Sequence, residues 1–189
     1  MSHKFMFDAS FYTLLIAIDR ELAEKELAKG CCYCGGKLHQ ANYPRSPFGL
    51  SIEFRPHFEE RLSFCCYDCR KRTTPPSVRF FGRRWFPGPI LILISSLMTS
   101  INERRLEQIK RHFGIVVSES TWKRWRRWWR EIFPGTAFWK SCTGLMHPHF
   151  ITGIFPRVLL KMYSGRLDEK MKLLLQFLSP MTAGVLRAV

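Results

Sequence analysis

Two pairs of cysteines with the spacing C-x-x-C are the residues of this sequence best suited to chemistry. The first pair is Cys31 and Cys34, and the second is Cys66 and Cys69. A C-x-x-C turn directs two thiolates toward one point, and two such turns supply the four ligands of a tetrahedral zinc site. Four thiolates leave no open position for water, so the pattern predicts one structural Zn2+ ion.

The residues around these pairs indicate how the site is built. Gly35 and Gly36 follow the first pair, and glycines there let the chain turn so that backbone N–H groups face the sulfurs. The pattern is typical of a zinc ribbon, in which two short β-hairpins hold one ion. The interval between the pairs is long, which implies an insertion between the hairpins.

Three further cysteines leave alternatives open. Cys32 and Cys65 adjoin the two pairs, so either could replace a neighbour as a ligand. Cys142 is distant, and we expect it not to bind. A disulfide framework fits an odd total of seven cysteines poorly, although buried core thiols remain an alternative. Charged residues such as Asp19 interrupt the first apolar stretch, so no signal peptide is predicted and we expect a reducing cytoplasm.

Charge indicates the class of partner. The 189 residues include 30 Lys and Arg against 15 Asp and Glu, a formal net charge of +15. Nucleic acid is the first candidate partner and an anionic membrane surface the second. No acidic residue occurs between Asp68 and Glu103. In that interval we expect five basic residues to follow a DNA backbone: Arg70, Lys71, Arg72, Arg83 and Arg84.

Three consecutive helices are predicted after this interval. The first begins at Pro87 or Pro89 and runs to about Ser100. A helix that crosses a bilayer needs about 20 apolar residues, and this one is shorter. It is therefore predicted to be a buried helix, and no membrane partner is expected. The second covers 103–112 and is followed by a turn at Gly114. The third covers 121–132, with Ser118 or Ser120 as its cap. This order predicts a helix-turn-helix, whose last helix enters the DNA major groove.

The third of these helices has two different faces. Tryptophans recur at helical spacing on one face, where they should pack on the other two helices: Trp122, Trp125 and Trp129. Basic residues recur on the opposite face, where they suit guanine edges and phosphates: Lys123, Arg126, Arg127 and Arg130. The alternative is a solvated basic helix that binds nothing specific.

The remaining segments complete a small α+β prediction. A helix over 9–29 is capped by Asp8 or Ser10 and ends at Gly30. Alternating residues predict strands over 51–55 and 61–65. Helices are expected over 156–164 and 166–178, with a loose tail from Met181. The predicted segments are an N-terminal helix (1–30), a zinc ribbon with a basic connector (31–86), a helix-turn-helix (87–132) and a C-terminal helical region (133–189).

An active site is not predicted. His147, His149 and Tyr163 are similar to the metal-binding histidines and tyrosine nucleophile of single-strand nicking enzymes. Pro148 separates the histidines and removes a hydrogen bond from any strand that would carry them, so loop histidines are the preferred interpretation. Three carboxylates spaced for strand transfer are missing after the third helix of the predicted helix-turn-helix.

Taken together, the two cysteine pairs, the Pro75-Pro76 connector and the helix from Ser118 to Trp129 resemble the DNA-binding region of bacterial insertion-sequence transposases. The resemblance covers about residues 31 to 132 and lacks the catalytic domain. It implies a non-enzymatic, nucleoid-associated protein of a mobile element that binds double-stranded DNA, with a transposase or recombinase as candidate partner. One alternative is an adaptor that docks a recombinase or polymerase. Another is an RNA-binding ribbon that uses Trp85 and Phe86.

Overall fold

The structure, a computed structural model, describes residues 8–46, 53–81, 87–97, 107, 110, 118–144 and 154–183. It is a small α+β protein with short antiparallel strands and several helices, as predicted. The chain divides into two compact units. The first, here called the cysteine unit, extends to Gly88 and resumes at Leu175. The second, here called the helical unit, extends from Pro89 to Leu174.

Helix α1 (Ala9–Lys29) belongs to the cysteine unit, and both of its ends are those predicted from the sequence. Asp8 is the N-cap, and its Oδ1 accepts a hydrogen bond of 2.9 Å from the backbone N–H of Phe11. Gly30 ends the helix with a φ of +75°, a conformation that residues with a Cβ resist. The N–H of Gly30 also bonds the carbonyl of Leu27.

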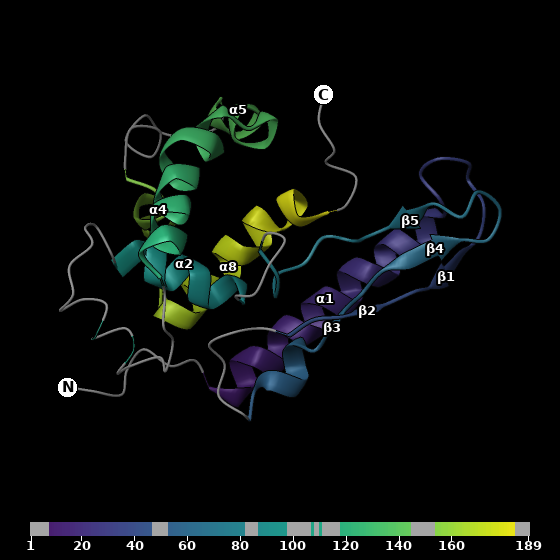
Figure 1. Ribbon diagram of the computed structural model, residues 1–189, viewed down its shortest axis with the longest axis horizontal. Helices are drawn as coiled ribbons and strands as arrows, with labels where there is room; N and C mark the ends of the chain where they lie inside the picture. Colours follow the sequence, from purple (N-terminus) through teal and green to yellow (C-terminus); the bar gives the residue numbers. More distant parts are fainter. Residues whose placement is uncertain are drawn as a thin grey trace. The chain divides into compact units, whose positions relative to one another are not determined.

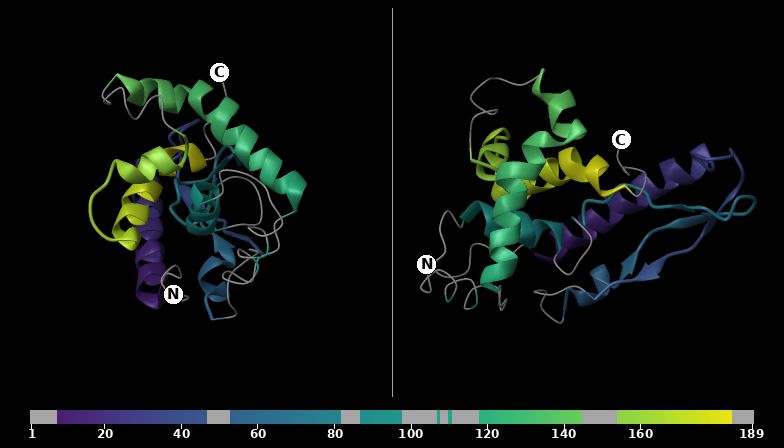
Figure 2. Two further views of the ribbon diagram at one scale, coloured as in Figure 1. Left: turned by 90° about the vertical axis from the view of Figure 1, so that its left-hand side faces the viewer. Right: turned by 45° about the horizontal axis from the view of Figure 1, so that its top comes forward.

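Five short strands form two antiparallel sheets in the cysteine unit. The first sheet has the order β1 (Leu38–Gln40), β4 (Phe64–Cys66) and β5 (Arg72–Thr73). Leu38 pairs with Cys66, and Phe64 pairs with Thr73. The second sheet consists of β2 (Tyr43–Pro44) and β3 (Glu60–Arg61). Figures 1 and 2 both show α1 running along these strands.

One predicted strand is wrong where the structure describes it, and the other is only partly correct. Glu53 and Phe54 lie in a turn, and a 3-10 helix follows (Arg55–Phe58). Pro56 explains the difference, because it fixes φ and removes a donor, which suits the first turn of a helix better than a strand. The predicted strand over 61–65 divides into the end of β3 and the start of β4.

The core of the cysteine unit has two parts, one around Ala23 and one around Tyr12. Ala23 from α1 packs with two strand residues and two of the cysteines: Leu38, Phe64, Cys31 and Cys66. Tyr12 lies nearer the N-terminus of α1. Its ring centroid is 4.5 Å from that of Phe54 and 5.7 Å from that of Phe58. Burial raises the pKa of Tyr12 to about 12. Helix α1 therefore supports both the sheet and the 3-10 helix.

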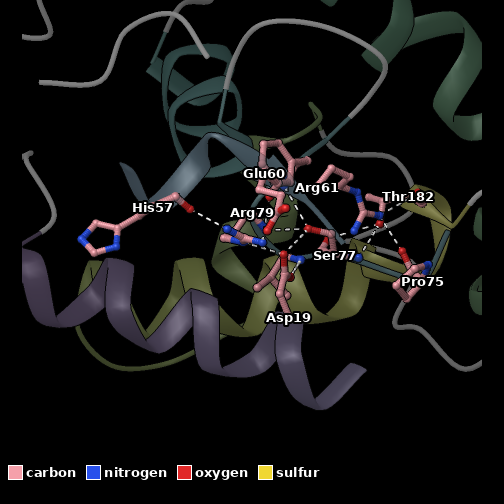
Figure 3. Close-up of polar contacts among 10 residues, drawn as sticks. Asp19, His57, Glu60, Arg61, Pro75, Ser77, Arg79 and Thr182 are labelled. Atoms are coloured by element: carbon pink, nitrogen blue, oxygen red, sulfur yellow. Dashed lines mark hydrogen bonds and ion pairs between the residues drawn. The ribbon is translucent and has the colours of Figure 1, made fainter. Parts of the chain in front are cut away.

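A buried ion pair joins α1 to the segment after β5 (Figure 3). Asp19 Oδ2 lies 2.7 Å from Arg79 Nε, and both side chains are almost fully buried. Asp19 also accepts hydrogen bonds from Ser77 Oγ (2.6 Å) and from the N–H of Val78 (2.7 Å). Arg79 therefore lies inside the core, although the sequence places it within the basic interval.

The end of the described chain is attached to the same region. A 3-10 helix (Ser179–Thr182) follows α8 (Leu167–Leu178). Thr182 Oγ1 accepts a hydrogen bond of 2.7 Å from the N–H of Ser77 and donates one of 3.2 Å to its carbonyl. The prediction of a loose tail from Met181 is therefore wrong at Thr182, and residues 184–189 lie outside the described part.

The helical unit begins with α2 (Gly88–Leu97), which confirms the predicted apolar helix. Ile90, Ile92 and Ile94 are all buried, as expected of a helix that is apolar on all sides. Arg157, at the start of α7 (Arg157–Lys161), donates from Nε and Nη2 to the carbonyl of Ser96 at 3.2 and 3.1 Å. Most of the helix predicted over 103–112 lies outside the described residues.

Helix α4 (Glu119–Arg127) corresponds to the third helix of the predicted helix-turn-helix. Ser118 is its N-cap, and Ser118 Oγ accepts a hydrogen bond of 3.2 Å from the N–H of Thr121. The α-helix changes into a π-helical turn (Trp128–Ile132) and then a 3-10 turn (Phe133–Gly135) before α5 (Ala137–Thr143). A hydrogen bond from the N–H of Phe133 to the carbonyl of Trp128 defines the π turn, which was not predicted.

Candidate metal centre and basic surface

The four cysteines of the two C-x-x-C pairs come together at one end of the first sheet. All four sulfurs lie within 4.8 Å of one another, so the group could hold a metal ion. The Sγ atoms of Cys31 and Cys69 are 3.5 Å apart, as are those of Cys34 and Cys66. Sulfurs bound to Zn2+ at about 2.3 Å in a tetrahedron would be about 3.8 Å apart. This spacing lies between the shortest sulfur–sulfur distances of 3.5 Å and the 4.8 Å within which all four sulfurs fall, so the cluster fits such an ion with small adjustments.

Different elements carry the two cysteine pairs. The first pair lies in the turn between α1 and β1, and the second lies in the turn of the β4–β5 hairpin. Among the described residues only the second pair is thus on a hairpin, which differs from the two hairpins that the sequence predicted. The turns meet because β1 pairs with β4, and because the N–H of Tyr67 bonds the carbonyl of Lys37 at 2.9 Å.

Backbone N–H groups and neighbouring sulfurs set the acidity of the cluster in opposite directions. The N–H of Tyr33 is the main cause that lowers the pKa of Cys31, to about 7, and burial opposes it. The N–H of Lys71 also lowers the pKa of Cys69, but burial and the three neighbouring sulfurs outweigh it and raise that pKa to about 12. One thiol therefore ionises readily, whereas full ionisation needs a cation among the sulfurs.

The two glycines after the first pair have separate roles. Gly35 has a φ of +73°, and a Cβ there would meet nothing within 4 Å. Gly36 has little space, because a Cβ there would clash with a carboxylate oxygen of Asp68 and lie 3.2 Å from Cys66 Sγ. Gly35 thus supplies the backbone conformation, and Gly36 lets the two turns approach.

The remaining cysteines do not join the cluster. Cys32 is exposed, and Cys65 Sγ is within hydrogen-bonding distance (3.5 Å) of the carbonyl of Arg70. Cys142 lies in α5. The alternative ligand sets with Cys32 or Cys65 are therefore not those that the structure assembles.

The four basic residues predicted on α4 and the following turn are all exposed: Lys123, Arg126, Arg127 and Arg130. Trp122 and Trp129 are 2% exposed, and Trp125 is half-buried. Trp129 packs on Phe133 with ring centroids 5.2 Å apart. The division into an aromatic and a basic side predicted from the sequence is therefore present along α4.

Two of these basic residues have acidic neighbours one helical turn away. Lys123 Nζ lies 2.8 Å from Glu119, and Arg127 Nε lies 2.9 Å from Glu131. All four side chains are more than half exposed, so each ion pair is worth only about 0.3–0.5 kcal/mol. Such pairs can exchange their carboxylate for a phosphate at small cost.

The predicted basic connector is only partly described. Arg70, Lys71 and Arg72 are exposed, whereas Arg83 and Arg84 lie outside the described residues. Arg72 also donates from Nη1 to the carbonyl of Ala41 and, at 2.9 Å, to Ser63 Oγ. It therefore stabilises the sheet as well as carrying charge.

Sequence reasoning missed two exposed aromatic residues of the metal centre. Tyr33 is 51% exposed and Tyr67 is 60% exposed, and each lies between the two cysteines of its own pair. The signal was present, because a side chain between two ligands of a tight turn tends to point away from the metal.

Of the three residues considered for a nicking site, Tyr163 alone lies among the described residues. His147 and His149 lie outside the described residues. The same holds for Trp85 and Phe86, the two residues of the RNA-binding alternative. Tyr163 is half-buried, and burial raises its pKa, with a further increase from the charge of Cys142. This shift opposes formation of a phenolate nucleophile.

In comparisons with protein-family models, curated proteins and solved structures, no significant match was found. Within the described residues, no helix combines the length and the apolar character needed to cross a membrane.

Proposed function

We propose that this chain binds double-stranded DNA and that one structural Zn2+ ion in the four-cysteine centre stabilises the cysteine unit. The observation that supports the metal is the meeting of four sulfurs within 4.8 Å. Soft thiolate ligands in a closed set favour Zn2+ over Mg2+ or Ca2+. Metal binding of this kind supplies about 10–16 kcal/mol to folding. The cysteine unit, with strands of two or three residues, has a small core that would benefit from it.

Metal analysis tests the zinc proposal. Protein purified under reducing conditions should contain one zinc per chain. Replacing Cys34 or Cys69 by serine should remove the metal and prevent soluble folding, because three sulfurs cannot close the site. Cys142→Ser is the matched control and should keep both metal and solubility. Freshly reduced, folded protein without zinc would contradict the proposal.

DNA binding is supported by the exposed basic side of α4 together with the net charge of +15. Arg126 and Arg130 have no ion pair within the described residues 118–144. An arginine offers two parallel donors to a phosphate or to the O6 and N7 of guanine. By the resemblance to transposase DNA-binding regions, we also propose that the DNA belongs to a mobile element and that a transposase or recombinase is a partner. No catalytic activity is proposed.

Fluorescence anisotropy with a labelled duplex tests this assignment. Affinity should fall steeply with salt, with a slope of about −0.9 for each phosphate contact. Arg126→Ala or Arg127→Ala should cost about 1–3 kcal/mol on the preferred site if that residue contacts a base. Lys140→Ala, an exposed lysine on α5, is the control. Circular dichroism must first show that each variant is folded, because α4 also carries buried tryptophans.

If both folded arginine variants bind the duplex with wild-type affinity, α4 is not part of the DNA interface. The adaptor function would then replace DNA binding, and its test is direct capture of a purified recombinase.

A further inference from the structure

The two cysteine turns share a backbone conformation but differ in sequence at one position. The residue after the second cysteine has a positive φ in both turns: +73° at Gly35 and +59° at Arg70. Arg70 is the one described non-glycine residue with a positive φ. Glycine adopts this conformation without strain, whereas a side chain there costs conformational free energy.

Arg70 is an unusual residue at this position, because the equivalent position of the first turn is a glycine. The first turn shows that glycine suits the backbone, so folding alone does not require arginine in the second turn. Residues in strained conformations concentrate at binding sites, because their side chains contribute something that the relaxed residue would not.

Arg70 lies over the exposed ring of Tyr67 in its own turn. The next residue, Lys71, lies over the exposed ring of Tyr33 in the other turn. The guanidinium carbon of Arg70 is 5.5 Å from the ring centroid of Tyr67, and Lys71 Nζ is 4.4 Å from that of Tyr33. His39, on β1, adds a third ring 5.6 Å from Tyr67. The end of the cysteine unit thus combines three exposed rings with adjacent positive charge.

The charge at this end favours an anionic partner. The exposed basic side chains outnumber the acidic side chains of the two turns. The basic residues are Lys37, Arg70, Lys71 and Arg72, and the acidic one is Asp68. Proteins that bind single-stranded nucleic acid combine these two features, because bases stack on aromatic rings while cations follow the phosphates. Each nucleotide of an unpaired strand presents a base face beside a phosphate, so such a strand would use the rings and the charge together.

We propose that this end of the cysteine unit binds the unpaired bases of single-stranded nucleic acid, with Tyr33 and Tyr67 as stacking residues and Arg70 and Lys71 as phosphate contacts. The site depends on the metal centre of the proposed function, which holds the two turns together. It does not depend on duplex binding by α4. Single strands of DNA and RNA both present an unpaired base next to a phosphate. The experiment below distinguishes DNA from RNA.

The test uses the full zinc-loaded chain and labelled 15-mers of four kinds: oligo(dT), oligo(U), an abasic DNA strand and a duplex. Wild type should bind oligo(dT) or oligo(U) more tightly than the abasic strand of equal charge. Tyr67→Ala should weaken binding to the base-containing strand about 5- to 140-fold and leave the abasic strand unchanged. Tyr67→Phe keeps the ring and should bind as wild type does. The tighter of oligo(dT) and oligo(U) identifies the strand.

Arg70→Gly separates binding from folding. It should leave the urea midpoint and zinc content equal to or above those of wild type, because glycine removes the strain. It should also reduce the salt slope of single-strand binding by about 0.7, the value for one phosphate contact. A loss of stability in Arg70→Gly would show that Arg70 is structural, and equal binding of abasic and base-containing strands would show that no base stacks. Either result overturns the proposal, whereas loss of duplex binding alone in Arg126→Ala would leave it standing.

Discussion

Replacing Asp19 by alanine should destabilise the cysteine unit strongly, because it leaves a buried arginine without its counterion. The side chain of Asp19 is fully buried, and that of Arg79 is 7% exposed. Figure 3 shows Asp19 projecting from α1 toward Arg79 and Ser77. Removal of the carboxylate would take away the ion pair and two further hydrogen bonds at once.

Two estimates bound the size of the effect. Three hydrogen bonds to a charged acceptor, at about 1.5–3 kcal/mol each, give an upper value near 4.5–9 kcal/mol. Measured losses for breaking one partner of a buried ion pair are about 3–5 kcal/mol. The second range is preferable, because the cavity left by alanine can admit water and Arg79 keeps its bonds to the carbonyls of His57 and Glu60. We therefore expect a loss of about 3–5 kcal/mol.

Urea denaturation with saturating zinc and a reductant measures this loss. Glu24→Ala, an exposed residue of the same helix, is the control and should change stability by less than about 0.5 kcal/mol. The double variant Asp19→Ala, Arg79→Ala should lose at least about 1 kcal/mol less than the sum of the single losses, because the pair can be broken only once. Additive losses, or a loss below about 1 kcal/mol for Asp19→Ala, would refute the view that this ion pair holds α1 to the segment after β5.

Two further predictions concern the same unit. Gly36→Ala should weaken zinc affinity about 10–100-fold in a chelator competition assay, because its Cβ would clash with Asp68 and press on Cys66 Sγ, 3.2 Å away, whereas Gly35→Ala should lower stability by about 1 kcal/mol with little change in affinity. Equal effects of the two substitutions on affinity would contradict their separate roles. The pKa of Tyr12 is about 12 in the folded protein and about 10 in the unfolded chain. Its contribution to the free energy of unfolding is therefore complete below pH 10 and is lost as the pH rises from 10 to 12. Stability measured over that window should therefore fall less steeply for Tyr12→Phe than for wild type, and parallel curves would show that Tyr12 is not the group responsible.

The sequence by itself determined the features that depend on local residues. Asp8 and Gly30 mark the ends of α1, because capping and a positive φ are properties of single residues. The apolar run after Pro89 indicates a buried helix, and the spacing of tryptophans and arginines divides α4 into two sides. The cysteine spacing also predicted the four sulfurs that meet, because each C-x-x-C turn is a local unit.

Only the tertiary structure decided the features that depend on distant parts of the chain. Residue type and spacing gave no sign that Arg79 is buried while Arg70 is exposed, because the difference lies in Asp19, far away on α1. The sequence placed the first cysteine pair directly after a helix, but it could not show that this pair needs no hairpin of its own, because pairing of β1 with β4 brings its turn to the second pair. The positive φ of Arg70, which matches that of Gly35, was not predictable from its residue type, because arginine seldom adopts this conformation. Local signals fix caps, helix faces and ligand turns, whereas burial of a charge and the environment of a turn are set by contacts across the fold.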